Sequence, residues 1–220
     1  MKTKLKMALS LILSAIVIFS SIAIGGMFAS ADDAVTYDFN SETGVLTISG
    51  TGEVTQSGVL AKVTNRDDLK SVVINDGITS IGNGAFMNGY QELTSVTLPD
   101  TVTTIGELAF NGCNSLSTFT WSKNLISVGE EAFSMCTSLS ELYIPKGLET
   151  IGDGAFNGLK SLKEIAVDPE NKKFTVDDGV LFNADKTQLI LYPVCKEGTS
   201  YKVPDTVTTI CEGAFFTVNT

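Results

Sequence analysis

Apolar residues recur along this chain with a period of about 23 residues. The clearest repeated unit is a six-residue phrase close to I-G-x-x-A-F, which begins at Ile81, Ile105, Val128, Ile151 and Ile210. Its copies lie 24, 23 and 23 residues apart, and the last follows after 59. A fixed period in the twenties is typical of solenoids, in which each coil buries its apolar face against the next. The pattern therefore predicts a stack of coils.

A second repeated stretch lies upstream of the first in each coil. It begins at a leucine, and its first, fourth and sixth positions are mostly apolar; the leucines are Leu69, Leu93, Leu116, Leu139 and Leu162. Alternation over the fourth to sixth positions predicts a short strand with one buried face. One coil should then contain a strand, a turn, an extended return and a short helical turn around the Ala-Phe pair.

The repeated phrase supplies the core. Stacking places equivalent residues in columns, so we expect an aromatic ladder of Phe86, Phe110, Phe133, Phe156 and Phe215. Burial of each ring contributes about 1.5–3 kcal/mol. The alanines beside them are small enough for a close approach of the turn to the sheet. Gly82, Gly106 and Gly129 indicate a backbone position that is either crowded or takes a positive φ.

The stretch from Leu93 to Cys113 reads LTSVTLPDTVTTIGELAFNGC. It closely resembles the repeat LxxVxLPxxVTxIGxxAFxxC of the BspA-type leucine-rich repeat family of bacterial surface and secreted proteins. The resemblance extends over residues 69–167 and 199–216. It implies an α/β solenoid, a curved right-handed superhelix of about 23-residue coils whose strands line the concave face. It also implies a role in binding or adhesion, because family members share no catalytic residues.

Two segments depart from the repeat. Residues 32–66 predict an N-terminal β cap, a hairpin with its turn at 41–44, because an end coil exposes its core unless something covers it. Residues 67–220 form the predicted solenoid. Within it, residues 168–200 account for the long spacing and predict an inserted β-hairpin, with turn signals at 177–179 and 183–187.

The first 31 residues predict a signal peptide. Lys2, Lys4 and Lys6 precede an apolar stretch, and a small-x-small site ends at Ala31; this order is typical of secretory leaders. A retained membrane anchor is the alternative. After cleavage we expect a secreted or cell-surface protein with no membrane insertion.

The chain stops at GAFFTVNT, where another strand and a cap should follow. We therefore expect either a truncated protein or an incomplete last coil available for end-to-end self-association.

The composition excludes several kinds of partner and functional site. The formal net charge is −10, which makes nucleic acid an unfavourable partner. The chain has no histidine, which removes His-dependent nucleophile activation and the usual zinc sites. Adjacent acidic residues lack the spaced oxygen ligands of a calcium loop. We therefore expect no enzymatic activity, no cofactor and no metal site.

The outward positions of the predicted strands form the candidate ligand surface, because strand side chains alternate between faces. These candidate residues are Ser95, Thr97, Thr118, Thr120, Glu141, Tyr143, Glu164 and Lys202. The expected partner is a host or microbial surface protein or a glycan. Three alternatives remain: a solvated surface with no ligand, a structural spacer, and a fragment of a larger surface protein whose active domain lies elsewhere.

The four cysteines fall into two pairs. Cys113 and Cys136 share a repeat position, and their apolar column favours buried thiols over a disulfide. Cys211 replaces the glycine of the repeated phrase, and Cys195 follows the insertion. For these two, a disulfide that ties the insertion to the next coil and a pair of free thiols fit the pattern equally well.

Overall fold

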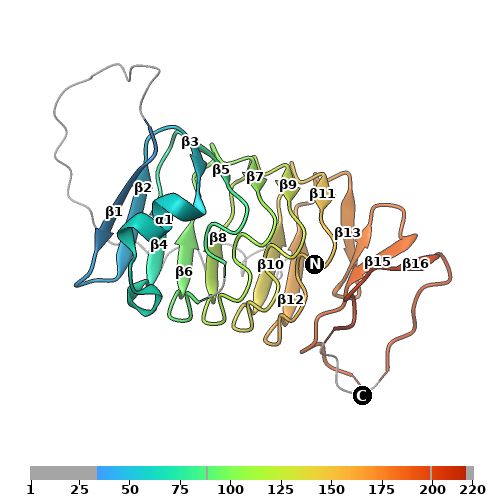
Figure 1. The fold of residues 1–220 in the computed structure, drawn as a ribbon. Coiled ribbons are helices and arrows are strands. Elements are labelled where there is room, and N and C mark those ends of the chain that lie inside the picture. The colour runs from blue at the N-terminus through green and yellow to red at the C-terminus, as the bar shows by residue number, and fades with distance from the viewer. Residues whose placement is uncertain (1–33, 88, 199, 217–220) are drawn as a thin grey trace, which may run out of the picture. The chain divides into compact units, whose positions relative to one another are not determined.

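Successive coils of the chain place equivalent strands side by side and parallel along two sides of the stack (Figure 1). The structure is a computed structural model that describes residues 34–87, 89–198 and 200–216. The predicted signal peptide and the last four residues lie outside the described residues. The register follows the sequence repeat: Ser71 pairs with Ser95, and Ser95 with Thr118. The predicted solenoid of about 23-residue coils is confirmed.

The first sheet carries the leucine-led strands. Its order is β1-β2-β4-β6-β8, with bounds β1 (Thr36–Asn40), β2 (Val45–Ser49), β4 (Ser71–Ile74), β6 (Ser95–Thr97) and β8 (Thr118–Thr120). Strands β10 (Glu141–Ile144) and β12 (Glu164–Val167) form a separate parallel pair. Regular pairing is therefore interrupted between β8 and β10, where half-buried Phe119 and Trp121 lie with ring centroids 4.5 Å apart.

The second sheet holds the start of the repeated phrase. Its order is β11-β9-β7-β5-β3, with bounds β3 (Gly52–Val54), β5 (Ile78–Ile81), β7 (Thr104–Ile105), β9 (Ser127–Val128) and β11 (Thr150–Ile151). One carbonyl per coil accepts a hydrogen bond from the glycine of the next coil. Examples are Gly106 N to Ile81 O at 2.7 Å and Gly129 N to Ile105 O at 2.8 Å.

The third side of each coil is a turn and not the predicted helical turn. The residue before the alanine takes a positive φ, which an α-helix excludes: 60° at Gly84, 56° at Leu108, 49° at Glu131 and 62° at Gly154. Turns of neighbouring coils bond directly, as Phe110 N does to Ala132 O at 2.8 Å. The described helices lie near the N-terminus, α1 (Gln56–Lys62) and the 3₁₀ helix η2 (Arg66–Asp68).

Crowding, and not a positive φ, explains the first glycine of the phrase. A Cβ on Gly129 would lie 2.5 Å from Glu107 N, and one on Gly82 would lie 2.7 Å from Val54 O. Neither residue is among those with a positive φ. Because the neighbouring atoms belong to the backbone of the adjacent coil, a side chain here would push the coils apart.

Four of the five predicted ladder rings stack in the core. Phe86 and Phe110 have centroids 5.2 Å apart, Phe110 and Phe133 5.3 Å, and Phe133 and Phe156 5.8 Å. The prediction for Phe215 is wrong. Its ring lies 5.2 Å from Tyr192, beside a second buried cluster of Val180, Phe182, Leu189 and Ala214.

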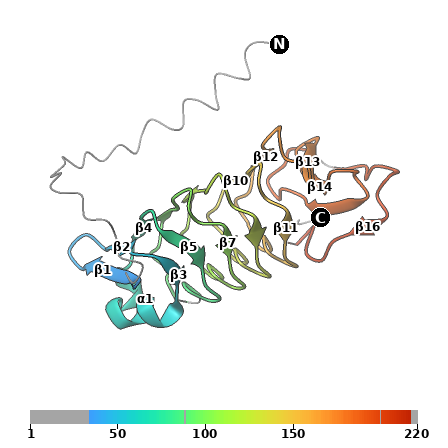
Figure 2. The same cartoon turned by 90° about the horizontal axis from the view of Figure 1, so that it is seen from above.

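The insertion separates the last coil from the ladder. It forms β13 (Phe174–Asp177), β14 (Val180–Asn183) and β15 (Gln188–Leu191), and β16 (Thr209–Ile210) pairs with β15. In Figure 2, β13, β14 and β16 lie together beyond β11 and β12. Tyr192 N donates to Ala214 O at 2.8 Å, so the last coil bonds to the insertion and not to the coil of Phe156.

At the N-terminal end, β1 and β2 pair antiparallel across a turn at residues 41–44. Strand β2 then pairs parallel with β4, which leaves β1 at the edge of the sheet. Gly44 takes a φ of 71° in this turn, a conformation that costs glycine little. The role of the hairpin as a cap for the solenoid stays a prediction.

Candidate functional site

The strand face is the outward surface of the leucine-led strands β4, β6, β8, β10 and β12. We define it as the side chains of these strands that point away from the core: Ser71, Val73, Ser95, Thr97, Thr118, Thr120, Glu141, Tyr143, Glu164 and Ala166. All are exposed or half-exposed. The alternate residues Val72, Val96, Leu142 and Ile165 are at most 5 % exposed. The strands thus turn seven of the eight predicted site residues to one surface.

The two halves of the strand face differ in chemistry. Strands β4 to β8 present mainly small hydroxyl groups, whereas β10 and β12 present carboxylates. Glu141 pairs directly with Glu164 in the parallel register, and both are exposed. Like charges placed opposite each other destabilise a sheet. A bound cationic group would relieve this repulsion.

Tyr143 is the next outward residue after Glu141 on β10, and its polar end is held by Asp168, the residue that follows β12. Its hydroxyl donates to Asp168 Oδ2 at 2.8 Å, and its side chain stays 38% exposed. Asp168 also accepts from Glu170 N at 2.9 Å. The ring is therefore fixed at its polar end while one surface faces solvent. A fixed aromatic ring loses little conformational freedom when a ligand packs on it.

Burial and the Asp168 carboxylate together raise the pKa of Tyr143 to about 12. The Glu170 N–H and the Tyr143 hydroxyl lower the pKa of Asp168. Because the folded pKa of Tyr143 exceeds its ordinary value of 10.0, its contribution to stability is complete below pH 10. That contribution is lost as the pH rises towards about 12, since the unfolded chain releases this proton first.

Replacement of Tyr143 by phenylalanine should therefore flatten the alkaline loss of stability. The unfolding free energy of the unmodified protein should fall more steeply between pH 10 and about 12 than that of Tyr143→Phe. Denaturant titrations over this range would measure the difference, and absorbance at the tyrosinate wavelength would follow the ionisation. Parallel pH profiles for the two proteins would contradict the assignment.

The eighth predicted site residue does not belong to the strand face. Lys202 lies outside any strand, and its Nζ lies 3.8 Å from Asp205 in an exposed ion pair. The prediction is wrong because the last coil does not continue the first sheet. It bonds to β15 instead, and in its described part β16 is the one segment that pairs with a strand.

Cys113 and Cys136 are buried free thiols, as predicted. Their Sγ atoms donate to Phe86 O at 3.3 Å and Phe110 O at 3.2 Å. Burial raises the pKa of Cys113 well above its usual range and that of Cys136 to about 12. Since the thiolate is the reactive form, both side chains act as small core residues.

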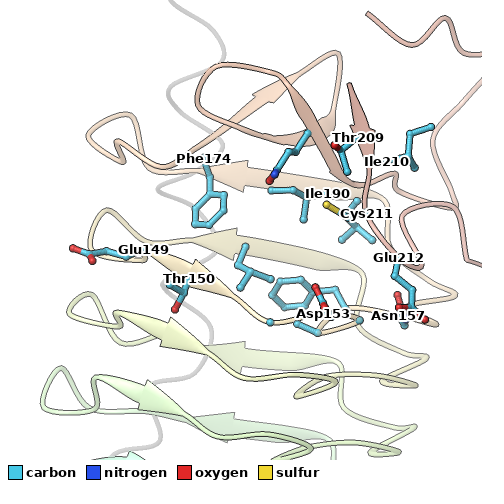
Figure 3. A pocket seen from close by; sticks show the side chains of 17 residues that line it. Glu149, Thr150, Asp153, Asn157, Phe174, Ile190, Thr209, Ile210, Cys211 and Glu212 are labelled. Atoms are coloured by element: carbon cyan, nitrogen blue, oxygen red, sulfur yellow. The ribbon is translucent and has the colours of Figure 1, made fainter. Parts of the chain in front are cut away.

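Cys195 and Cys211 are free thiols in the structure, so the disulfide alternative is not formed. Cys195 is exposed, and its Sγ donates to Lys160 O at 3.4 Å. Cys211 lines a cavity of about 540 Å³ between the coil of β11 and the strands β15 and β16 (Figure 3). Sequence reasoning missed this cavity because it stacked the last coil directly on the coil of Phe156.

Within the described ranges, no group of three or more acidic or cysteine side chains is placed to hold a metal ion. In the same part of the chain, no helix has the length and apolar character needed to cross a membrane.

Comparison with known proteins supports the repeat assignment. A family profile described as "BspA type Leucine rich repeat region" matches residues 63–182 with six copies. This range covers more than half of the chain, whereas the stretch 199–216 that resembled the repeat lies outside it. A sequence comparison with curated proteins found no match.

Several solved structures share the fold. A leucine-rich repeat protein from Eubacterium ventriosum is 30% identical with a TM-score of 0.64, over 84% of this chain and 55% of that one. The pneumococcal vaccine antigen PcpA is 22% identical with a TM-score of 0.62, over 88% of this chain and 62% of that one. A leucine-rich cell surface protein from Faecalibacterium prausnitzii is 21% identical with a TM-score of 0.56, over 83% and 66%.

The chain thus spans less than two thirds of the first two of these proteins. The likeness to PcpA and to the Faecalibacterium protein, at 22% and 21% identity, shows the shared fold alone. The repeat period, the parallel strands along two sides of the stack, the stacked phenylalanines and the six matched copies agree with one another. The chain belongs to the BspA-type leucine-rich repeat family of bacterial proteins.

Proposed function

We propose that this chain is a secreted or cell-surface binding module that holds a protein or a glycan on its strand face and carries out no catalysis. Family membership supports a binding role, because repeat solenoids present long exposed surfaces. The N-terminal order of basic residues, apolar stretch and small-x-small site supports export. The carrying observation is the exposed ring of Tyr143, whose hydroxyl is held by Asp168, on the same strand pair as the facing carboxylates of Glu141 and Glu164.

This arrangement favours a ligand with a cationic or sugar group at the β10–β12 end. The exposed tyrosine ring offers a surface for stacking or for a cation–π contact, and the two carboxylates accept hydrogen bonds. The hydroxyl-rich half, β4 to β8, offers donors and acceptors for the rest of the ligand. Screening the protein against arrays of extracellular proteins and of glycans would identify the ligand.

Tyr143→Ala should weaken binding of that ligand by about tenfold or more, because aromatic anchors dominate binding surfaces. The double variant Glu141→Gln with Glu164→Gln should weaken it in a salt-dependent way. Calorimetry or surface plasmon resonance would measure both. Ile126→Ala, an exposed apolar change just before β9, and Glu92→Gln are matched controls.

Unchanged affinity in the Tyr143 and acidic variants would place the ligand elsewhere on the chain. Absence of any ligand across both screens would support the structural spacer. Turnover of a substrate, lost on removal of one carboxylate, would contradict the non-catalytic proposal.

A further inference from the structure

The second sheet ends at β11 with an unused bonding edge. In earlier coils the carbonyl of the last strand residue accepts a bond from the next coil, and Val128 O accepts from Gly152 N at 2.9 Å. The equivalent carbonyl is Ile151 O, and among the described residues no donor reaches it. Cys211 N, the repeat equivalent of Gly152 N, donates to Leu189 O at 2.9 Å instead.

The insertion causes this loss of pairing. One period after Thr150 and Ile151 the chain has reached Lys173 and Phe174, where a further strand of the second sheet would lie. Phe174 instead begins β13, which pairs antiparallel with β14. Strand β11 therefore keeps β9 as its strand neighbour and faces the cavity on its other side.

The cavity beside β11 combines an apolar floor with an acidic rim. Figure 3 shows Phe174 and Ile190 pointing towards the coil of β11 from above, while Asp153 and Glu212 lie together at one side. Buried Phe156 and Leu191 complete the apolar part of the lining, which we call the floor. The described lining residues include three carboxylates, those of Glu149, Asp153 and Glu212, and no lysine or arginine.

We propose that this cavity is a second binding site, which takes an extended basic peptide segment as an added strand on β11. The carbonyl of Ile151 accepts a backbone N–H of the peptide, apolar side chains of the peptide occupy the floor, and lysines or arginines meet the rim. Strand addition to an exposed sheet edge is a recurrent mode of peptide recognition. A volume of about 540 Å³ falls within the range of ligand sites.

Charge decides between a basic partner and a second copy of this chain. The protein has a formal net charge of −10, and the rim is acidic, so edge-to-edge pairing of two copies brings like charges together. Short edge strands flanked by charges resist such self-pairing. The same carboxylates attract a basic segment.

The site is independent of the strand face, so either proposal can fail without the other. The probe is the peptide Lys-Val-Lys-Val-Lys-Val-Lys, acetylated and amidated, titrated calorimetrically into the protein at low and at moderate salt. We expect saturable binding, and none with the matched peptide in which glutamate replaces lysine. Two further peptides carry N-methyl groups on all valines or on all lysines. The N–H groups of the valines and those of the lysines point to opposite edges of an extended peptide, and only one edge faces β11. One N-methylated peptide should therefore lose binding about tenfold or more, and the other should keep it.

Variants locate the peptide on the protein. Asp153→Asn with Glu212→Gln should weaken binding about tenfold, and Ile190→Trp, which fills the cavity, should remove it. Glu42→Gln with Glu92→Gln is the matched control, since it makes the same charge change on two exposed turns outside both proposed sites. In a Cys195→Ser background, bound peptide should slow the reaction of Cys211 with a maleimide.

The proposal is overturned if the lysine peptide does not bind, or if both N-methylated peptides bind as well as the parent. It is also overturned if the turn control weakens binding as much as the rim variant does. The last two outcomes would mean that the peptide associates through charge alone.

Discussion

Replacing Phe133 by alanine should lower the free energy of unfolding by about 3–5 kcal/mol, the range for large-to-small changes at buried aromatic positions. Phe133 is fully buried and has more ring neighbours than any other member of the ladder. Its centroid lies 5.3 Å from Phe110, 5.8 Å from Phe156, 4.9 Å from Phe119 and 5.1 Å from Trp121. Its removal would open a cavity in the middle of the stack.

Trp121 is the single tryptophan of the chain, so its fluorescence during denaturant titration reports on the coils around Phe133. Far-ultraviolet circular dichroism should give the same midpoint. Phe156→Ala should cost less, because among the described rings Phe156 stacks on Phe133 alone.

Phe215→Ala is the informative control. Its ring packs in the second cluster with Tyr192, so the transition followed through Trp121 should shift by about 1 kcal/mol or less, as for independent sites. A shift as large as that of Phe133→Ala would mean that the two clusters unfold as one core, contrary to their separation in the structure.

The regular part of the fold was predictable because each stacked coil repeats the same arrangement of strands, turns and buried side chains. The period fixes which residues share a column, and alternation fixes which strand positions point outward. Thus the Phe86 to Phe156 ladder and the exposure of Glu141, Tyr143 and Glu164 followed from spacing alone. The break between β8 and β10 did not, because it depends on how the aromatic residues Phe119 and Trp121 fit between neighbouring strands.

Repeat logic failed where the chain departs from the stack. The phrase at Ile210 matches the others in sequence, yet its coil bonds to β15, so Phe215 and Lys202 lie away from their predicted columns. Pairing between the insertion and a later coil is a long-range contact, which no local sequence pattern predicts. The turn conformation was also mispredicted, since Leu108 and Glu131 adopt the positive φ of their glycine equivalents.

One residue does mark the place where the stack ends. The column that begins each return segment is apolar and buried in four coils, at Ile78, Val102, Leu125 and Leu148. At the next period it holds Asn171, which is 9% exposed. A buried asparagine in an apolar column must satisfy its hydrogen bonds locally. The insertion begins directly after it.

Asn171→Leu should therefore destabilise the protein by about 2–4 kcal/mol, although it restores the apolar column. The carboxamide makes four hydrogen bonds, which leucine would abolish. Its Nδ2 donates to Pro145 O at 2.7 Å and Leu148 O at 3.1 Å, and its Oδ1 accepts from Lys173 N at 2.8 Å and Phe174 N at 2.9 Å. Buried backbone groups left without partners cost about 1–3 kcal/mol each, offset in part by the apolar surface that leucine buries.

Denaturant titration of Asn171→Leu beside Asn114→Leu would measure this cost. Asn114 bonds to Gln91 on the surface at 2.6 Å, so its replacement should change stability by about 0.5 kcal/mol or less, as is usual for surface positions. Equal stabilities for Asn171→Leu and the unmodified protein would mean that column packing outweighs the four bonds. A cost confined to Asn171 would instead mean that its carboxamide joins the last regular coil to the start of β13. Asn171 would then be the residue that directs the chain away from β11 and leaves the edge of that strand open.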